Sequence, residues 1–546
     1  MSRPAAQLAL RNGALYLPGA ERTQAGAVAV ADSRIAYCGP DSGLAAWLGP
    51  GTEVVDLRGG MLLPGLHDSH IHSVFGGLFV PECDLSGLTS AAEYLAALAD
   101  YAAGHPDKPC LRGQGWMPSV FGPAGPRREQ LDGVDASRPV VVTSADGHAA
   151  WVNSAALRLA GIGRETPDPP GGLIDRDPAG GEPSGVLREL CAIQLVSDRL
   201  PPPDPAERRC RGEEFLERMA SLGVTAIHDA AAFPESLEAC RRLDREGRLR
   251  LRVDAALLAD PSQDSSQVLR LLEERRRYRG RNLKADSVKV FLDGTVEGHT
   301  AYLLEPYADR PDSRGSPLWG REALLGLVAR LDAEGVRVHA HAMGDAAVRL
   351  ALDAFAEARR RNGARDSRHM ISHLELVDPA DVPRFAELGV IANFQPSWFY
   401  QDDLSDAPLE GFLGRRRLNR RFCMGALYRA GAQVVSGSDW PVGGDQITCN
   451  PLDLLQTGTV RKPLCGRGRS YMPQERLPLA AMLDSMTRRA AFASFRERET
   501  GALEAGKKAD LAVLDRDLFA GPPESIHRAR VELTVFDGKI VYRRGG

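Results

Sequence analysis

Histidine, lysine and aspartate residues recur along the chain at positions that could hold a metal ion. The stretch LLPGLHDSHIH (62–72) places three histidines directly after an apolar segment and a Pro-Gly turn. Later apolar segments carry Lys289, His339, His341, His373 and Asp439. Imidazole and carboxylate groups are suitable ligands for zinc and related divalent ions, and a catalytic site keeps one position open for water. The pattern therefore indicates a hydrolytic metal centre.

Each of these residues lies on or directly after a short apolar segment that reads as a buried strand. Eight such segments are each followed by a connection long enough for a helix, and they cover residues 61–72, 223–230, 248–257, 287–294, 336–345, 369–376, 389–398 and 432–442. This alternation predicts an α/β fold with a parallel (β/α)₈ TIM barrel. Catalytic residues of such barrels collect at the carboxyl ends of the strands. The fold would therefore bring the scattered side chains together.

Strand periodicity separates the three histidines of the first segment. Side chains two positions apart on a strand face the same side, so His70 and His72 are both expected to point into the barrel. His67 has the opposite parity and is expected in a loop or outside the ligand set.

The other polar strand residues have ordinary explanations when each is taken alone. His341 is the better ligand of its pair because His339 lies deeper in the barrel, and His228 fits the core and the pocket wall equally well. A single strand lysine such as Lys289 is most often paired with a neighbour, and a lone strand-end aspartate such as Asp439 is usually a turn residue or helix cap. Their joint occurrence on strands one, four, five, six and eight favours the metal centre.

Segments outside the barrel pattern indicate two further parts. Residues 5–60 and the C-terminal stretches KKADLAVLDRD and VELTVFDGKIVYRRG read as short strands joined by tight turns, so both termini are expected to build one small β-sandwich domain. The connection after the first strand is far too long for a simple loop and predicts an inserted lobe over the barrel mouth. The predicted division is 1–63 and 499–546 for the β-sandwich domain, 64–84 and 208–498 for the barrel, and 85–207 for the inserted substrate-pocket lobe.

Composition excludes several classes of partner. Of the 546 residues, 43% are hydrophobic and 26% are charged, as in ordinary globular proteins, and no apolar run reaches the ~18 residues of a membrane span. The formal charge of -4 gives no basic excess for nucleic-acid binding. Nine scattered cysteines without a CxxC pair favour reduced thiols and a cytoplasmic protein. A small-molecule substrate is expected, and formation of a homodimer is left open.

The motifs resemble those of the metal-dependent amidohydrolase superfamily, and more narrowly its branch of YtcJ-like proteins and N-substituted formamide deformylases. The resemblance spans nearly the whole chain and rests, in order, on LLPGLHDSHIH, RGQGW, DGHAAWVNSAAL, VKVFLDG, HAHAMGDAAV, RHMISHLELV, VVSGSDWPV and GALEAGKKADLAVLD. It implies that His70 and His72 bind one metal with Asp439, and that His341 and His373 bind a second.

Lys289 falls where such enzymes often carry a carboxylated lysine that bridges two metals. A plain ammonium has no lone pair for a cation, whereas its carbamate has. The expected cofactor is therefore a divalent metal, with zinc as the first choice, present as one ion or as two if Lys289 is carboxylated.

The resemblance implies hydrolysis of a non-peptide C–N bond in an amide, formamide or other N-acyl compound. In the expected mechanism the metal lowers the pKa of a bound water, the resulting hydroxide attacks the carbonyl, and Asp439 acts as general base and then as general acid. Ester, lactone or imine hydrolysis, decarboxylation at the same centre, and a catalytically silent regulatory or binding relative remain alternatives.

Five residues are the expected substrate contacts: Trp116, His148, Glu297, His299 and Trp440. Packing is an equally ordinary role for the residues of the insert. After the fourth strand the branch commonly reads Asp-Gly-Ser-Leu-Gly-Ser-Arg-Thr-Ala, whereas this chain has DGTVEGHTA, so Glu297 and His299 replace a small residue and an arginine. This departure leaves the substrate open.

Overall fold

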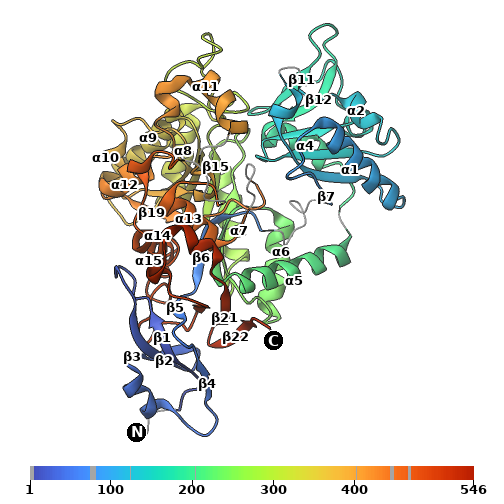
Figure 1. Ribbon diagram of the computed structural model, residues 1–546. Coiled ribbons are helices and arrows are strands. Elements are labelled where there is room, and N and C mark those ends of the chain that lie inside the picture. The colour runs from blue at the N-terminus through green and yellow to red at the C-terminus, as the bar shows by residue number, and fades with distance from the viewer. Residues whose placement is uncertain are drawn as a thin grey trace.

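Three β-sheets organise the chain in the computed structural model (Figure 1). The structure describes residues 5–73, 82–122, 125–202, 204–400, 403–442, 448–464 and 469–545. One sheet is built from both ends of the chain, one lies in the segment after the first barrel strand, and the third is the barrel itself.

The barrel sheet contains eight strands that follow one another in chain order, and every hydrogen-bonded pair along it is parallel. The strands are β6 (Leu66–Ile71), β13 (Val224–Ala232), β14 (Arg252–Leu258), β15 (Leu283–Phe291), β16 (Arg337–Ala342), β17 (Met370–His373), β18 (Ile391–Phe394) and β19 (Gln433–Ser436). Their burial on both faces explains the continuous apolar runs in the sequence. The predicted parallel eight-stranded, TIM-like barrel is confirmed.

The ends of β6 and β19 approach each other and nearly close the barrel. Asp439 N donates to His70 O over 2.7 Å, and His72 N donates to Trp440 O over 2.8 Å. Gly437 allows this approach, because a Cβ at that position would lie 2.3 Å from His70 N. The same contacts place the two histidines next to Asp439.

Helices pack around the outside of the barrel. Those after successive strands are α6 (Pro234–Arg245), α7 (Gln267–Arg277), α8 (Arg321–Ala333), α9 (Asp345–Asn362), α10 (Val382–Leu388), α11 (Asp403–Leu418), α12 (Met424–Arg429), α13 (Pro451–Val460), α14 (Leu479–Ser485) and α15 (Arg488–Ala493). In α9, buried Ala347, Ala351, Ala354 and Ala358 recur every three to four residues, which is the spacing of a core-facing stripe. Among the helices of the described ranges, none is long and apolar enough to cross a membrane.

Strands from both termini form one hydrogen-bonded sheet, with neighbouring strands in the order β22-β21-β20-β5-β1-β2-β3 and with β4 paired to β1. They are β1 (Leu8–Leu15), β2 (Gln24–Ala31), β3 (Arg34–Gly39), β4 (Glu53–Asp56), β5 (Met61–Pro64), β20 (Leu511–Leu514), β21 (Val531–Phe536) and β22 (Lys539–Arg543). The termini accordingly lie at the same end of the molecule in Figure 1. Both termini contribute strands to the same β-structure, as predicted. These strands belong to a single branched sheet, however, and the predicted β-sandwich is not confirmed.

The segment between β6 and α5 (Pro205–Ser221) forms a separate lobe beside the barrel (Figure 1). Its sheet has the order β11-β12-β10-β9-β8-β7. The elements are β7 (Cys83–Asp84), α1 (Ala91–Gly104), β8 (Leu111–Trp116), α2 (Arg128–Asp132), β9 (Val140–Ser144), β10 (Ala149–Val152), α3 (Ser154–Ala160), β11 (Leu173–Arg176), β12 (Pro183–Arg188) and α4 (Glu189–Ser197). The loop between β9 and β10 and the start of α4 reach the barrel cavity.

Candidate metal centre

Three side chains from three strand ends form a compact cluster of metal-ligating groups. The ligand atoms of His70, His373 and Asp439 all lie within 4.8 Å of one another, and the three residues are buried. Asp439 Oδ1 lies 3.2 Å from His70 Nε2 and 3.1 Å from His72 Nε2, and Asp439 Oδ2 lies 3.8 Å from His373 Nδ1. Ligands around a common zinc ion at about 2.0–2.1 Å would have similar separations.

The backbone at two of these positions adopts a conformation that non-glycine residues rarely take. His373 has a φ of 74° at the end of β17, and Asp439 has a φ of 60° just beyond β19. Such strained residues persist only where the surrounding structure holds them, and they concentrate at functional sites. Both strained residues belong to the metal-ligating cluster.

Hydrogen bonds behind the cluster orient the imidazole rings. His70 Nδ1 lies 3.2 Å from His339 Nε2, and His339 Nδ1 lies 2.7 Å from His228 Nε2. His341 Nδ1 lies 3.3 Å from Asp293 Oδ1. Histidines that bind metals commonly direct their second ring nitrogen to such a partner. Nε2 is thus the atom that His70 has left for an ion or a substrate, whereas His341 Nδ1 is near Asp293 without forming a hydrogen bond in the described structure.

The protonation states of the cluster suit cation binding. Burial, followed by the charge of Lys289, lowers the pKa of His70 to about 3, and burial lowers the pKa of His341 and His373 well below the ordinary value. Burial also lowers the pKa of Lys289 to about 8. Neutral imidazoles have free lone pairs, and a lysine of low pKa offers a neutral amine for carboxylation.

The residues present fit a divalent cation. Lys289 Nζ is buried without a hydrogen-bond partner in the described part of the chain, as are His70 Nε2 and His373 Nδ1. Buried polar atoms of this kind need a partner or an ion. Two imidazoles and a carboxylate within 4.8 Å of one another supply donors of the kind that such an ion requires.

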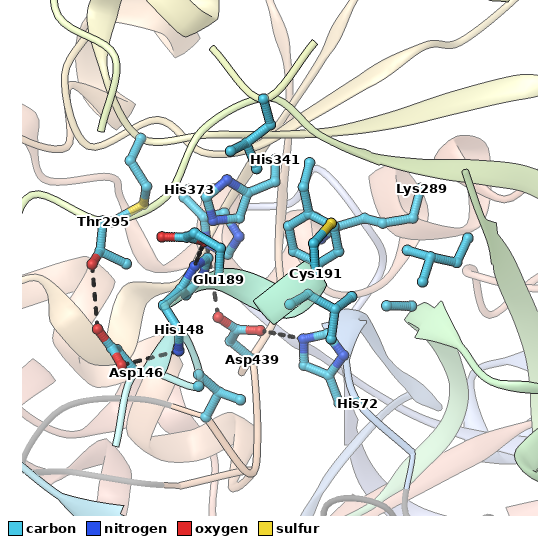
Figure 2. Close-up of a pocket in the computed structure, with 18 of the residues that line it drawn as sticks. His72, Asp146, His148, Glu189, Cys191, Lys289, Thr295, His341, His373 and Asp439 are labelled. Atoms are coloured by element: carbon cyan, nitrogen blue, oxygen red, sulfur yellow. Dashed lines mark hydrogen bonds and ion pairs between the residues drawn. The ribbon is translucent and has the colours of Figure 1, made fainter. Parts of the chain in front are cut away.

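A cavity of about 440 Å³ opens beside the cluster. His72, Lys289, His341, His373 and Asp439 line it, so five of the six predicted ligands face the same space, and His70 lies buried next to them. Figure 2 shows His148 of the lobe close to His341 and to Asp439. The lobe thus forms part of the cavity wall.

His148 is held by a buried carboxylate that the sequence analysis did not identify. Its Nδ1 lies 2.7 Å from Glu189 Oε2, and its ring centroid lies 4.9 Å from that of His341. Burial alone would lower the pKa of His148, but the adjacent Glu189 raises it to about 9. Gly294 makes room for this pair, because a Cβ there would lie 2.0 Å from Glu189 Oε1.

Three predicted substrate contacts lie elsewhere. Trp116 is buried in the core of the lobe and donates from Nε1 to Val142 O over 2.9 Å. Trp440 stacks on Phe215 of α5 with ring centroids 5.9 Å apart. His299 is bound to Asp309 and packs against Phe412. None of these three lines the cavity in the described structure, whereas Glu297 and His148 do.

Other residues near the cavity gave no signal in the sequence. Asp293 accepts hydrogen bonds from the backbone of Tyr302, Met343 and Gly344, and so anchors the loops after β15 and β16. Glu375 pairs with Arg421 at 2.5 Å on the cavity wall. The backbone N–H groups that bind Asp293, and the Arg421 side chain that binds Glu375, come from other segments of the sequence. Folding brings these partners together, so no local pattern indicates the pairings. His67, expected outside the ligand set, contacts Ser494 beyond α15.

Comparisons with known proteins agree with this geometry. Residues 53–542 match the model of the amidohydrolase family. The chain is 30% identical to the putative amidohydrolase YtcJ of Bacillus subtilis, with 91% of each chain covered. It is 29% identical to the N-substituted formamide deformylase of Arthrobacter pascens, with 96% of each chain covered.

A solved structure extends the likeness to three dimensions. An uncharacterized metal-dependent hydrolase from Pyrococcus horikoshii has 25% sequence identity and a TM-score of 0.74, covering 94% of this chain and 99% of that one. The family match covers most of the sequence, and the buried His/His/Asp cluster suits a divalent metal. The chain therefore belongs to the amidohydrolase family and is a hydrolase that acts on C–N bonds.

Proposed function

We propose that the chain hydrolyses a non-peptide C–N bond in a small amide, formamide or other N-acyl compound. One observation carries the proposal: the ligand atoms of His70, His373 and Asp439 converge within 4.8 Å beside a cavity of about 440 Å³. A cavity of this size suits a small molecule. The relative named as an N-substituted formamide deformylase supports the choice of bond.

The proposed ligands form two sets. His70, His72 and Asp439 would hold one ion, and His341 and His373 a second, with Lys289 between them if it is carboxylated. We infer zinc as the ion. When bound, it would lower the pKa of a water molecule toward neutrality and polarise a carbonyl group.

Two side chains of the protein would move or donate protons. Asp439 lines the cavity and would accept the proton of the attacking water, then pass it to the leaving nitrogen. His148 has Nδ1 bound to Glu189, so Nε2 is the ring atom available to the substrate. A protonated Nε2 would donate a hydrogen bond to the substrate oxygen as negative charge develops there.

The inserted lobe, residues 85–207 in the proposed division, would set specificity. It contributes His148, Glu189 and Cys191 to the cavity wall, and these residues reach the cavity from outside the barrel. Changes in this lobe would alter the choice of substrate while the metal ligands stay in place on the barrel strands.

The function can be tested with metal analysis and matched substrates. The purified protein is stripped with a chelator, reloaded separately with zinc, manganese or ferrous iron, and assayed on N-formyl and N-acetyl amines and on the corresponding esters. We expect turnover of the amides in proportion to bound metal. Less than one equivalent of tightly bound metal, or hydrolysis of the esters alone, would contradict the proposal.

A pair of variants on one strand gives the control. His70→Gln removes a proposed ligand, whereas His67→Gln changes a histidine of the opposite parity on the same strand β6. We expect His70→Gln to lose metal and activity and His67→Gln to retain both. Equal metal retention by the two variants would show that His70 is not a metal ligand.

A further inference from the structure

One wall of the cavity carries an acidic group that the proposed chemistry does not use. Glu297 follows β15 and lines the cavity. Its carboxyl is enclosed by protein atoms, while the side chain keeps a partly exposed face toward the cavity. Apart from its own backbone N–H, no group in the described ranges donates a hydrogen bond to this carboxyl or pairs with it.

The charges around Glu297 do not balance. Glu375 and Asp146 are both close enough to disfavour its ionised form, and Arg421 is the cation that favours it. Arg421, however, already donates from Nε to Glu375 Oε1 over 2.5 Å. Asp146 accepts from the hydroxyl of Thr295 and from the backbone N–H of His148. The wall therefore has more carboxylates than cations.

Desolvation makes this imbalance costly. Burial, followed by the negative charge of Glu375, raises the pKa of Glu297 to about 8. With this pKa the protonated, neutral carboxyl is favoured near pH 7, and a cation bound beside Glu297 would favour the ionised form instead. Since Glu297 lines the cavity, a bound molecule can place such a cation beside it.

Aromatic rings line the same cavity and suit the same kind of group. Trp398 and Tyr400 both line the cavity. The Trp398 ring stacks on His373 with centroids 5.6 Å apart and an interplanar angle of 14°, so this ring lies directly beside the metal cluster. The negative faces of aromatic rings attract ammonium and guanidinium groups, most strongly where water is excluded.

We propose that Glu297, together with the Trp398 and Tyr400 rings, binds a cationic amine or guanidinium group of the substrate. The substrate would then be an N-acyl or N-formyl compound that carries a second, positively charged nitrogen group away from the scissile bond. This rests on the proposed function of the metal centre for the identity of the scissile bond. An anionic group would instead need Arg421, whose guanidinium is already engaged by Glu375.

The test uses three N-formyl amines that share one alkyl chain and end in an ammonium, a methyl or a carboxylate group. For the metal-loaded wild type, we expect kcat/KM for the ammonium compound to exceed that for the methyl compound by about tenfold or more. Glu297→Gln should abolish this preference by lowering kcat/KM for the ammonium compound about tenfold relative to that for the methyl compound. The control Glu274→Gln changes a carboxylate of the same cavity that already pairs with Arg270, and it should keep the preference.

Failure of this proposal can be distinguished from failure of the proposed function. If the compounds are hydrolysed equally, if the carboxylate compound is preferred, or if Glu297→Gln retains the preference, cation recognition by Glu297 is wrong while the hydrolase assignment stands. If none of the three compounds is hydrolysed, their binding affinities are measured by calorimetry, which tests cation recognition by Glu297 without turnover. Tighter binding of the ammonium compound that is lost in Glu297→Gln supports the site, and equal affinities overturn it.

Discussion

Asp439 has two proposed tasks at the end of β19, because it lies among the ligand atoms and also lines the cavity. Burial alone would raise its pKa, but the neighbouring His70 and His72 hold the pKa well below the ordinary value, so the carboxylate is charged. A charged carboxylate can bind a cation through one oxygen and accept a proton on the other.

Replacing Asp439 by Asn should separate these tasks. The amide oxygen can still act as a ligand but cannot carry a proton, so we expect metal content close to wild type and a fall in kcat of about 10²–10⁴-fold. Asp260→Asn, a change of another cavity carboxylate away from the cluster, should have little effect on kcat. Near-full activity of Asp439→Asn with normal metal content would exclude a proton-carrying role.

At this scale, sequence periodicity could locate the cluster but not every cavity residue. The two-residue alternation on β6 predicts that His70 and His72 share one side; both lie beside Asp439, whereas His67 contacts Ser494. Trp116 and Trp440 lie outside the described cavity because their rings pack into cores formed by distant segments. Glu189 reaches His148 across 41 positions, a pairing that no local pattern indicates.

At the scale of elements, a buried carboxylate joins helix α8 to the loop between α9 and β17. Asp332 accepts hydrogen bonds from Asn362 over 2.7 Å and from Ser367 over 2.6 Å, and it lies 3.3 Å from His369 Nε2. Burial would raise its pKa, but the nearby His369 and the hydrogen bond from Ser367 prevail and lower it. The charged form is thus the one that ties these elements together.

Asp332→Asn should therefore lower stability in a pH-dependent manner. A carboxylate whose pKa is lowered on folding stabilises the protein above its unfolded pKa of about 3.9, and that contribution is lost as the pH falls toward the folded pKa. We expect the melting temperature of the variant to lie below that of wild type above about pH 5, with the gap narrowing in acid. Thermal melts at constant metal loading would measure it. Asp366→Asn, at an exposed carboxylate nearby, is the control, and a gap that widens in acid would contradict the assignment.

The element pattern itself was largely readable from the sequence. Eight apolar segments with intervening helices predict a parallel barrel because strands buried on both faces are apolar throughout. The single sheet formed by the termini was less predictable. The parallel pairings of β1 with β4 and with β5, and the antiparallel pairing of β5 with β20, join segments whose partners the sequence does not specify.

At the scale of the whole molecule, one buried ion pair connects the barrel to the sheet built from the termini. Arg252 at the start of β14 donates to both oxygens of Asp510, over 2.6 Å and 3.0 Å, and both side chains are 3% exposed. Asp510 precedes β20, which pairs with β5, the strand that leads into β6. The pair therefore joins the C-terminal segment to the part of the chain that carries the first proposed ligands.

Replacing Arg252 should weaken the contact between the barrel and the terminal sheet more than breaking an exposed ion pair would. Arg252→Met leaves Asp510 buried without its partner, which typically costs about 3–5 kcal/mol, so we expect the melting temperature of this 546-residue chain to fall by about 3–4 °C. Hydrogen exchange should rise first in β20, β21 and β5. The control Arg544→Met breaks an exposed pair with Glu532 and should shift melting by about 1 °C or less. Equal shifts in the two variants, or exchange that rises evenly over the barrel, would show that the pair does not hold the terminal sheet to the catalytic barrel.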